Sequence, residues 1–222
     1  MNRFHCLFSR MFLPAAVLTL AVLLLLISLF ETTQAAYLPS DGGKTLHIIM
    51  YHSILKDPAR TGKYVVTPAQ LKADFEYLRK HGYTSVLPRD LVKYAKGEAD
   101  LPEKCVMLTF DDGYYNNLLY LLPLLEEYSF NALISVVGKF TRLYTDSGDK
   151  NPNYAHLSYD DIRLLDASGK IEIGNHTYDM HKLEPIRGSG RKKGESDAQY
   201  DKRLSGDLMK LQKELENNGI TV

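Results

Sequence analysis

Five short apolar runs, separated mostly by segments with helical periodicity, constrain the fold of this chain more than any other feature. Each run has the length and the content of β-branched, aliphatic or aromatic residues that are typical of a strand. The runs occupy residues 46–51, 84–87, 105–110, 132–137 and 170–175. Because strands that alternate with helices form parallel sheets, the pattern predicts an α/β domain built on a parallel sheet.

Two helices have clear start and stop signals. The first begins after Thr67, with Pro68 at its first position and Gln70 completing a capping box, and Gly82 ends it. The second is expected over residues 196–218, where apolar side chains recur on one stripe: Tyr200, Leu204, Leu208, Leu211 and Leu215. We interpret this stripe as a surface that packs against the core rather than one that binds a partner.

An uninterrupted apolar stretch at residues 11–30 follows two arginines at the N-terminus. It is long enough to span a bilayer core, which favours a retained membrane anchor with its N-terminus in the cytoplasm. Residues 33–35 are also a plausible cleavage site of a secretory signal peptide, before Ala36. Both interpretations predict that the following portion is exported, either anchored at the extracytoplasmic face of the membrane or secreted to the cell wall. Residues 1–35 are the leader or anchor, and residues 36–44 are a linker.

Composition and cysteine content exclude several classes of function. The chain carries 27 basic and 27 acidic residues, so no polyanion-binding surface is expected and nucleic acid is not predicted as a partner. Cys6 precedes the apolar stretch and Cys105 lies in a predicted strand beyond it, so the two are not expected to pair. Cys105 is interpreted as a small buried apolar residue.

Residues 45–222 suffice for one domain and are too few for two.

Carboxylates and imidazoles follow two of the predicted strands, at the positions where α/β folds place their chemistry. Asp111 and Asp112 follow one strand, and His176 follows another, with His181 five positions later. On a helix the two histidines would lie roughly 140° apart, so we expect them to bind a ligand from a loop. One carboxylate with two imidazoles suits a divalent transition metal, Zn²⁺ first, while Co²⁺, Ni²⁺ and Fe²⁺ would also be accepted. Since neighbouring side chains on an extended segment point in different directions, one aspartate can bind metal while the other handles protons.

The two segments Thr-Phe-Asp-Asp-Gly at 109–113 and His-Thr-x-x-x-His at 176–181 resemble motifs of the polysaccharide deacetylases of the NodB-homology type. The resemblance implies that Asp111 is the general base. It implies three metal ligands, which are Asp112, His176 and His181, with Thr177 as a supporting residue of their loop. It also implies a distorted (β/α) barrel of parallel strands, of which this chain supplies about five.

His52 follows the first predicted strand and is expected at the same end of the sheet, so we assign it a supporting role without making it a ligand. His47, His81 and His156 are interpreted as structural. The resemblance covers residues 45–222. The later motifs of the family, namely a supporting arginine, an aromatic segment at the groove and a distal general-acid histidine, are not found downstream. We therefore expect the domain to be incomplete at its C-terminus.

These residues predict a metal-dependent hydrolase that removes N-acetyl groups from an N-acetylglucosamine polymer of the cell envelope. Peptidoglycan, an exopolysaccharide and a chitin-like polymer all remain open as substrates. Two alternatives remain. One is a catalytically inactive glycan-binding or regulatory module that keeps the metal loop, and the other is a metal amidase that acts on a small non-sugar amide.

Overall fold

The computed structural model describes residues 44–184 and 186–222. The predicted leader, its apolar span at 11–30, Cys6 and all but the last residue of the predicted linker lie outside these described residues. Within the described ranges, none of the helices combines the length and the apolar content that a membrane crossing requires.

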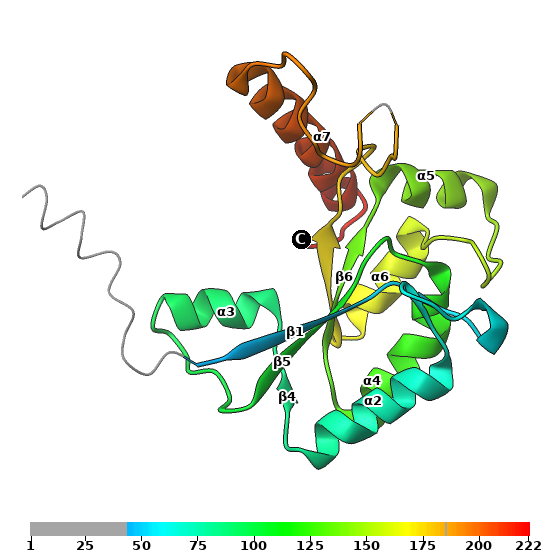
Figure 1. The fold of residues 1–222 in the computed structure, drawn as a ribbon, viewed down its shortest axis with the longest axis vertical. Helices are drawn as coiled ribbons and strands as arrows, with labels where there is room; N and C mark the ends of the chain where they lie inside the picture. The colour runs from blue at the N-terminus through cyan, green and yellow to red at the C-terminus, as the bar shows by residue number, and fades with distance from the viewer. Residues whose placement is uncertain (1–43, 185) are drawn as a thin grey trace, which may run out of the picture. The chain divides into compact units, whose positions relative to one another are not determined.

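The main sheet has five strands, and every pairing in it is parallel, which confirms the predicted α/β architecture. The strands are β1 (Leu46–Tyr51), β4 (Thr84–Ser85), β5 (Cys105–Phe110), β6 (Ala132–Val136) and β7 (Ile171–Asn175). Their order is β1-β5-β6-β7, with β4 also paired to β5. In the described part of the chain, β1 and β7 lie at the ends of this order, so the sheet stays open and the barrel is not closed (Figure 1).

The helices lie mainly between the strands, as the periodicity predicts. They are α2 (Pro68–Lys80), α3 (Pro88–Ala95), α4 (Leu122–Tyr128), α5 (Gly138–Ser147), α6 (Tyr159–Ala167) and α7 (Asp197–Asn217), with a short 3₁₀ turn η1 (Pro58–Arg60) and a π-helical turn η2 (Asn117–Leu121). Helices α2 and α4 pack on each other, and α6 and α7 both contact β7 (Figure 1). A second, two-stranded sheet of β2 (Ser53–Ile54) and β3 (Val65–Val66) was not expected.

Helix α2 begins and ends where its sequence signals predict. The Thr67 hydroxyl accepts the N–H of Gln70 at 3.1 Å, and the Gln70 side chain accepts the N–H of Thr67 at 2.8 Å, which completes the capping box. Gly82 takes a left-handed φ of 75° just after the helix ends. The apolar face of α2 is buried, with Leu71 and Phe75 fully inside the core. This face fixes α2 against the sheet.

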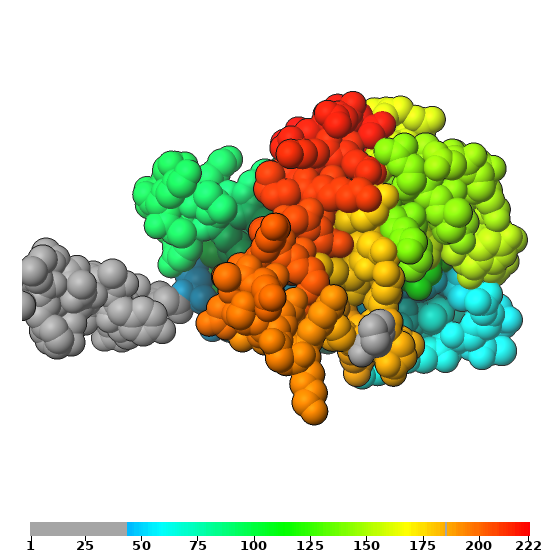
Figure 2. Space-filling view, turned by 90° about the horizontal axis from the view of Figure 1, so that it is seen from above, coloured from blue at the N-terminus to red at the C-terminus, as the bar shows by residue number. Residues whose placement is uncertain are grey.

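Helix α7 differs from the prediction in how much of its apolar stripe is buried. Leu211 and Leu215 in its C-terminal half belong to the core, whereas Tyr200, Leu204 and Leu208 are only partly buried. Figure 2 shows the reason: the N-terminal half of α7 (orange) lies beside the segment that follows β7 (gold). One helix therefore contacts both the core and a loop at the carboxyl end of the sheet.

Candidate metal centre

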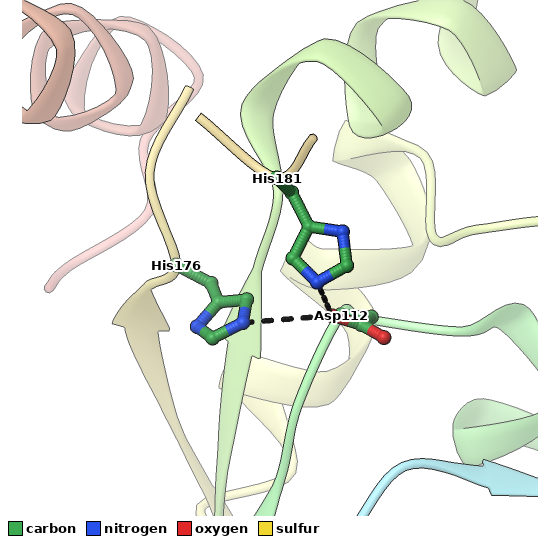
Figure 3. A group of neighbouring side chains, drawn as sticks. All are labelled: Asp112, His176 and His181. Atoms are coloured by element: carbon green, nitrogen blue, oxygen red, sulfur yellow. Dashed lines mark ion pairs between the residues drawn. The ribbon is translucent and has the colours of Figure 1, made fainter. Parts of the chain in front are cut away.

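Strands β5 and β7 deliver a carboxylate and an imidazole to the same edge of the sheet. Both strands are parallel to β6, which lies between them, so their carboxyl ends meet. Asp112 lies two residues after β5, and His176 comes directly after β7. Figure 3 shows the side chains of Asp112, His176 and His181 converging from these two segments. The structure thus brings together the three residues that were expected to bind metal.

The three side chains are close enough to share one ion. Their potential ligand atoms all lie within 4.8 Å of one another. Nε2 of His181 is 3.0 Å and Nε2 of His176 is 3.5 Å from Oδ1 of Asp112. The Asp112 side chain is 6% exposed, against 34% for His176 and 44% for His181. The cluster is therefore closed on the carboxylate side and open to solvent on the imidazole side.

The residues fit a metal because the buried oxygen of Asp112 has no other partner. Among the described residues, Oδ1 of Asp112 accepts no hydrogen bond, although it lies within ion-pair distance of both imidazoles. The approach of His181 is thus a close contact without the direction of a hydrogen bond. Buried polar atoms are nearly always paired, and an orphan of this kind needs an explanation. A divalent transition ion bound to this oxygen and to the two imidazoles would give Oδ1 of Asp112 its missing partner. Such an ion would also keep coordination positions free for water and substrate.

Backbone strain is concentrated beside these ligands. Asp112 has a φ of 71° and Thr177 a φ of 73°, and non-glycine residues rarely adopt this region. Each such residue costs on the order of 1–3 kcal/mol and persists only where its surroundings fix it. Val136 packs closely against the backbone of Gly113 and so helps to fix the turn that follows Asp112. Only glycine allows this contact, because a Cβ at position 113 would lie 2.8 Å from Cγ1 of Val136. Strain held in place on both sides of the cluster supports a functional role for this edge.

Residues 176–181, which we call the histidine loop, are non-helical, as the spacing of the two histidines predicts. The Asn175 side chain accepts the N–H of Thr177 at 3.0 Å, and the Thr177 carbonyl accepts the N–H of Gly138 at 3.1 Å. The Thr177 hydroxyl accepts the N–H of Met180 at 3.3 Å. These bonds join the start of the loop to its end and to the beginning of α5.

Asp111 is half-buried and lies outside the group of three converging side chains. Its N–H donates to the carbonyl of Tyr51 at 2.9 Å, which ties it to the end of β1. Within the described ranges its carboxylate makes no ion pair and no hydrogen bond. Asp111 thus differs from its neighbour Asp112 in its surroundings, and its role as a base stays a prediction.

A cavity of about 390 Å³ opens beside the cluster, and both Asp112 and His181 line it. His52 also lines it, so it lies at the end of the sheet where its position after the first strand predicts. Its ring lies 4.8 Å from the ring of Tyr64, a second lining residue. Tyr114 completes the aromatic part of the wall. The volume is within the range of small-ligand sites.

His156 lies near the cluster, since Phe140 packs against both His156 and His181, although no sequence pattern separates it from the other histidines interpreted as structural. Its ring packs against those of Phe140 at 4.5 Å, Tyr114 at 4.6 Å and Tyr144 at 5.4 Å. Its Nδ1 atom is buried without a hydrogen-bond partner in the part of the chain that the structure describes. Burial lowers the pKa of His156 from 6.5 to about 4. The imidazole of His156 is therefore neutral at neutral pH and packs behind Tyr114, which lines the cavity.

Replacing His156 by Gln is expected to flatten the loss of stability on acidification. Because the pKa of His156 is about 4 in the folded protein and 6.5 ordinarily, the unfolded chain binds a proton first as pH falls. The stabilisation is complete above pH 6.5 and is lost as pH falls toward 4, by about 3 kcal/mol in total. Urea unfolding of the metal-free protein across this range measures the effect. His81→Gln, at an exposed histidine, is the control, and equal slopes for His156→Gln and the unmodified chain would refute the assignment.

Comparisons with known proteins give the site a family context. A family model described as polysaccharide deacetylase matches residues 98–219, which is more than half of the chain and includes both motifs. YxkH of Bacillus subtilis, which is named for the same family, is 29% identical over 157 residues, covering 70% of this chain and 50% of that protein. The poly-β-1,6-N-acetyl-D-glucosamine N-deacetylase of Escherichia coli O157:H7 is 24% identical over 181 residues, covering 74% of this chain and 27% of that protein.

The fold of the chain has solved counterparts. A de-N-acetylase from Aggregatibacter actinomycetemcomitans superimposes with a TM-score of 0.65 at 25% identity, covering 78% of this chain and 74% of that one. By contrast, the chain spans half or less of the length of the two curated relatives.

Proposed function

Because the chain belongs to the polysaccharide deacetylase family, we propose that it is a metal-dependent hydrolase that removes N-acetyl groups from an N-acetylglucosamine polymer. The observation that carries the proposal is the buried, unbonded Oδ1 of Asp112 at 3.0 and 3.5 Å from two imidazole nitrogens. It lies at the wall of a cavity that is open to solvent. An acetamide resists attack by water at neutral pH, so its hydrolysis needs an activated nucleophile, which a metal bound at this centre would supply.

In this proposal Asp112, His176 and His181 hold the metal. A divalent transition ion, Zn²⁺ in the first instance, would supply a nucleophilic water at neutral pH and would stabilise negative charge on the acetyl oxygen. Co²⁺, Ni²⁺ and Fe²⁺ accept the same ligands. Since Asp112 and His181 line the cavity, the three ligands would hold the metal at its wall, where an acetyl group can reach it.

Asp111 is the general base of the proposal. It takes the proton of the attacking water, a role that typically contributes about 10²–10⁴-fold. Its half-buried carboxylate directly adjoins Asp112 in the chain, and the hydrogen bond of its N–H to the carbonyl of Tyr51 fixes its backbone. The base and one of the metal ligands, Asp112, thus come from one turn after β5, so the positions of these two carboxylates depend on few torsion angles.

The substrate proposed is a polymer that contains N-acetylglucosamine and lies outside the cytoplasm. The E. coli relative is named for deacetylation of such a polymer, the β-1,6-linked form, which supports this class of substrate. Tyr64 and Tyr114 at the cavity provide aromatic faces, on which the apolar faces of sugar rings pack. Export depends on residues 1–35. This segment would either stay as a membrane anchor or be cleaved from the exported protein as a signal peptide.

The test measures bound metal and acetate release for the full-length chain. The substrates are β-1,6-linked and β-1,4-linked N-acetylglucosamine oligomers and a small acetamide. Acetate release from an oligomer that stops on chelation and returns with Zn²⁺ supports the proposal. Bound metal and oligomer binding without acetate release would instead indicate a glycan-binding module. Release from the small acetamide alone would indicate an amidase, and a chain that binds no metal would refute the site.

A further inference from the structure

The middle of α7 contacts the histidine loop and the end of β7 through polar groups. The side-chain amide of Asn175 donates to the carbonyl of Leu208 at 2.9 Å. The ammonium group of Lys210 lies 3.5 Å from the centre of the Tyr178 ring, within the range of a cation–π contact. Both contacts join α7 to the segment that carries His176.

Asp207 makes the most direct of these contacts. Its Oδ1 accepts the N–H of Tyr178 at 2.6 Å, and its Oδ2 accepts the N–H of Asp179 at 3.0 Å. Hydrogen bonds to a carboxylate are shorter and roughly twice as strong as those between neutral groups. The two N–H groups belong to the middle of the loop, between His176 and His181. The Asp207 side chain therefore fixes the backbone between the two histidines, and the conformation of this backbone sets the distance between the two imidazoles.

The opposite side of the loop is held by the beginning of α5. The N–H groups of Gly138 and Lys139 donate to the carbonyls of Thr177 and Tyr178 at 3.1 and 2.8 Å. Gly138 has no room for a side chain, because a Cβ there would lie 2.5 Å from the Tyr178 ring. The carbonyls are thus fixed by α5 and the N–H groups by Asp207. Removal of Asp207 would leave the N–H groups of Tyr178 and Asp179 without their hydrogen-bond acceptor, while the carbonyls stay bound to α5.

We propose that Asp207 is a positioning residue that holds His176 and His181 at the separation a metal ion requires. The inference rests on the proposed function in that it takes these two histidines as ligands. Asp207 touches neither imidazole, so it acts through the backbone of the loop. Side chains that orient metal ligands typically contribute about 10–100-fold to metal affinity. Asp207 is expected to contribute in this range.

The experiment compares Asp207→Ala, Asp207→Asn and a control, Asp201→Ala, in the full-length chain. Asp201 is exposed on the same helix, so its replacement removes the same charge without touching the loop. The dissociation constant for Zn²⁺ is measured by competition with a chelator, and the visible absorption spectrum of the Co²⁺ form reports the ligand geometry. Thermal unfolding of the metal-free forms shows whether each variant is folded.

Asp207→Ala is expected to weaken Zn²⁺ binding about 10–100-fold and to change the Co²⁺ spectrum, while Asp201→Ala binds as the unmodified chain does. Asp207→Asn is expected to lose less Zn²⁺ affinity, because its amide oxygen still accepts one of the two N–H groups. If the alanine variant does not fold, the comparison uses the asparagine variant instead. A folded variant with lower thermal stability but unchanged affinity and spectrum would overturn the inference and leave the metal site intact. An unmodified chain that binds no metal would overturn the proposed function and this inference together.

Discussion

Replacing Asp111 by Asn is expected to reduce acetate release by about 10²–10⁴-fold while metal stays bound. Asparagine has the size of aspartate but cannot take a proton from water at neutral pH. The substitution leaves the N–H of residue 111 free to donate to Tyr51, and it does not alter the three converging side chains. Turnover of an N-acetylglucosamine oligomer and elemental analysis of bound metal, both on the same preparation, measure the two effects separately.

The control for this prediction is Asp100→Asn, which removes one carboxylate from an exposed position away from the cluster. It is expected to leave both turnover and metal content unchanged. Two results would contradict the role of Asp111. Turnover at the level of the unmodified chain would mean that another group takes the proton, and loss of metal would mean that Asp111 is itself a ligand.

Most of the fold could be predicted because its strands are local in sequence. The apolar run at 105–110 becomes β5 with the same bounds, and the run at 84–87 yields a shorter strand, β4. The difference has a local cause. Leu87 is the N-cap of α3, and Pro88 takes the first position of that helix, so the strand ends early. Signals that depend on neighbours in the chain, such as caps and periodicity, are readable without tertiary structure.

Features that depend on distant contacts could not be predicted. The small sheet of β2 and β3 has only two residues in each strand, too few for a period to be recognised. It is fixed by Asn116, whose side chain accepts the N–H of Ile54 at 3.0 Å and donates to the hydroxyl of Ser53 at 2.9 Å. Asp207 is a comparable case. Its helix was expected, but its contact with the histidine loop arises only when α7 packs beside β7.

The candidate site falls between these two cases. Motif spacing places Asp112 after one strand and His176 after another, and parallel strands bring such residues to one edge. The closeness of the three side chains needs more, namely the order β5-β6-β7 and left-handed backbone at Asp112 and Thr177. No sequence pattern in this chain predicts a positive φ at Asp112 or Thr177. The edge of the sheet at which these residues lie was therefore predictable, and the left-handed backbone that brings their side chains together was not.

Replacing Asp112 by Asn is expected to abolish metal binding and, at the same time, to stabilise the metal-free protein. The carboxylate is 6% exposed, and its Oδ1 has no hydrogen bond in the described part of the chain. A buried group left unpaired costs about 1–3 kcal/mol, and more when it is charged. Asparagine removes the charge, keeps the volume, and tolerates the φ of 71° at this position. Without a metal, the part of the penalty that is due to the buried charge is removed.

Thermal unfolding at pH 8, with a chelator and then with Zn²⁺, measures both parts of this prediction. With the chelator, the variant is expected to melt about 2–4 °C above the unmodified chain, the shift that roughly 1 kcal/mol produces in a domain of this size. With Zn²⁺ the order is expected to reverse, because binding stabilises only the chain that retains its ligand. A metal-free variant that melts below the unmodified chain would mean that the carboxylate is stabilised by the two imidazoles. In that case the cluster would be a structural ion-pair network, and the unbonded oxygen would no longer argue for a metal.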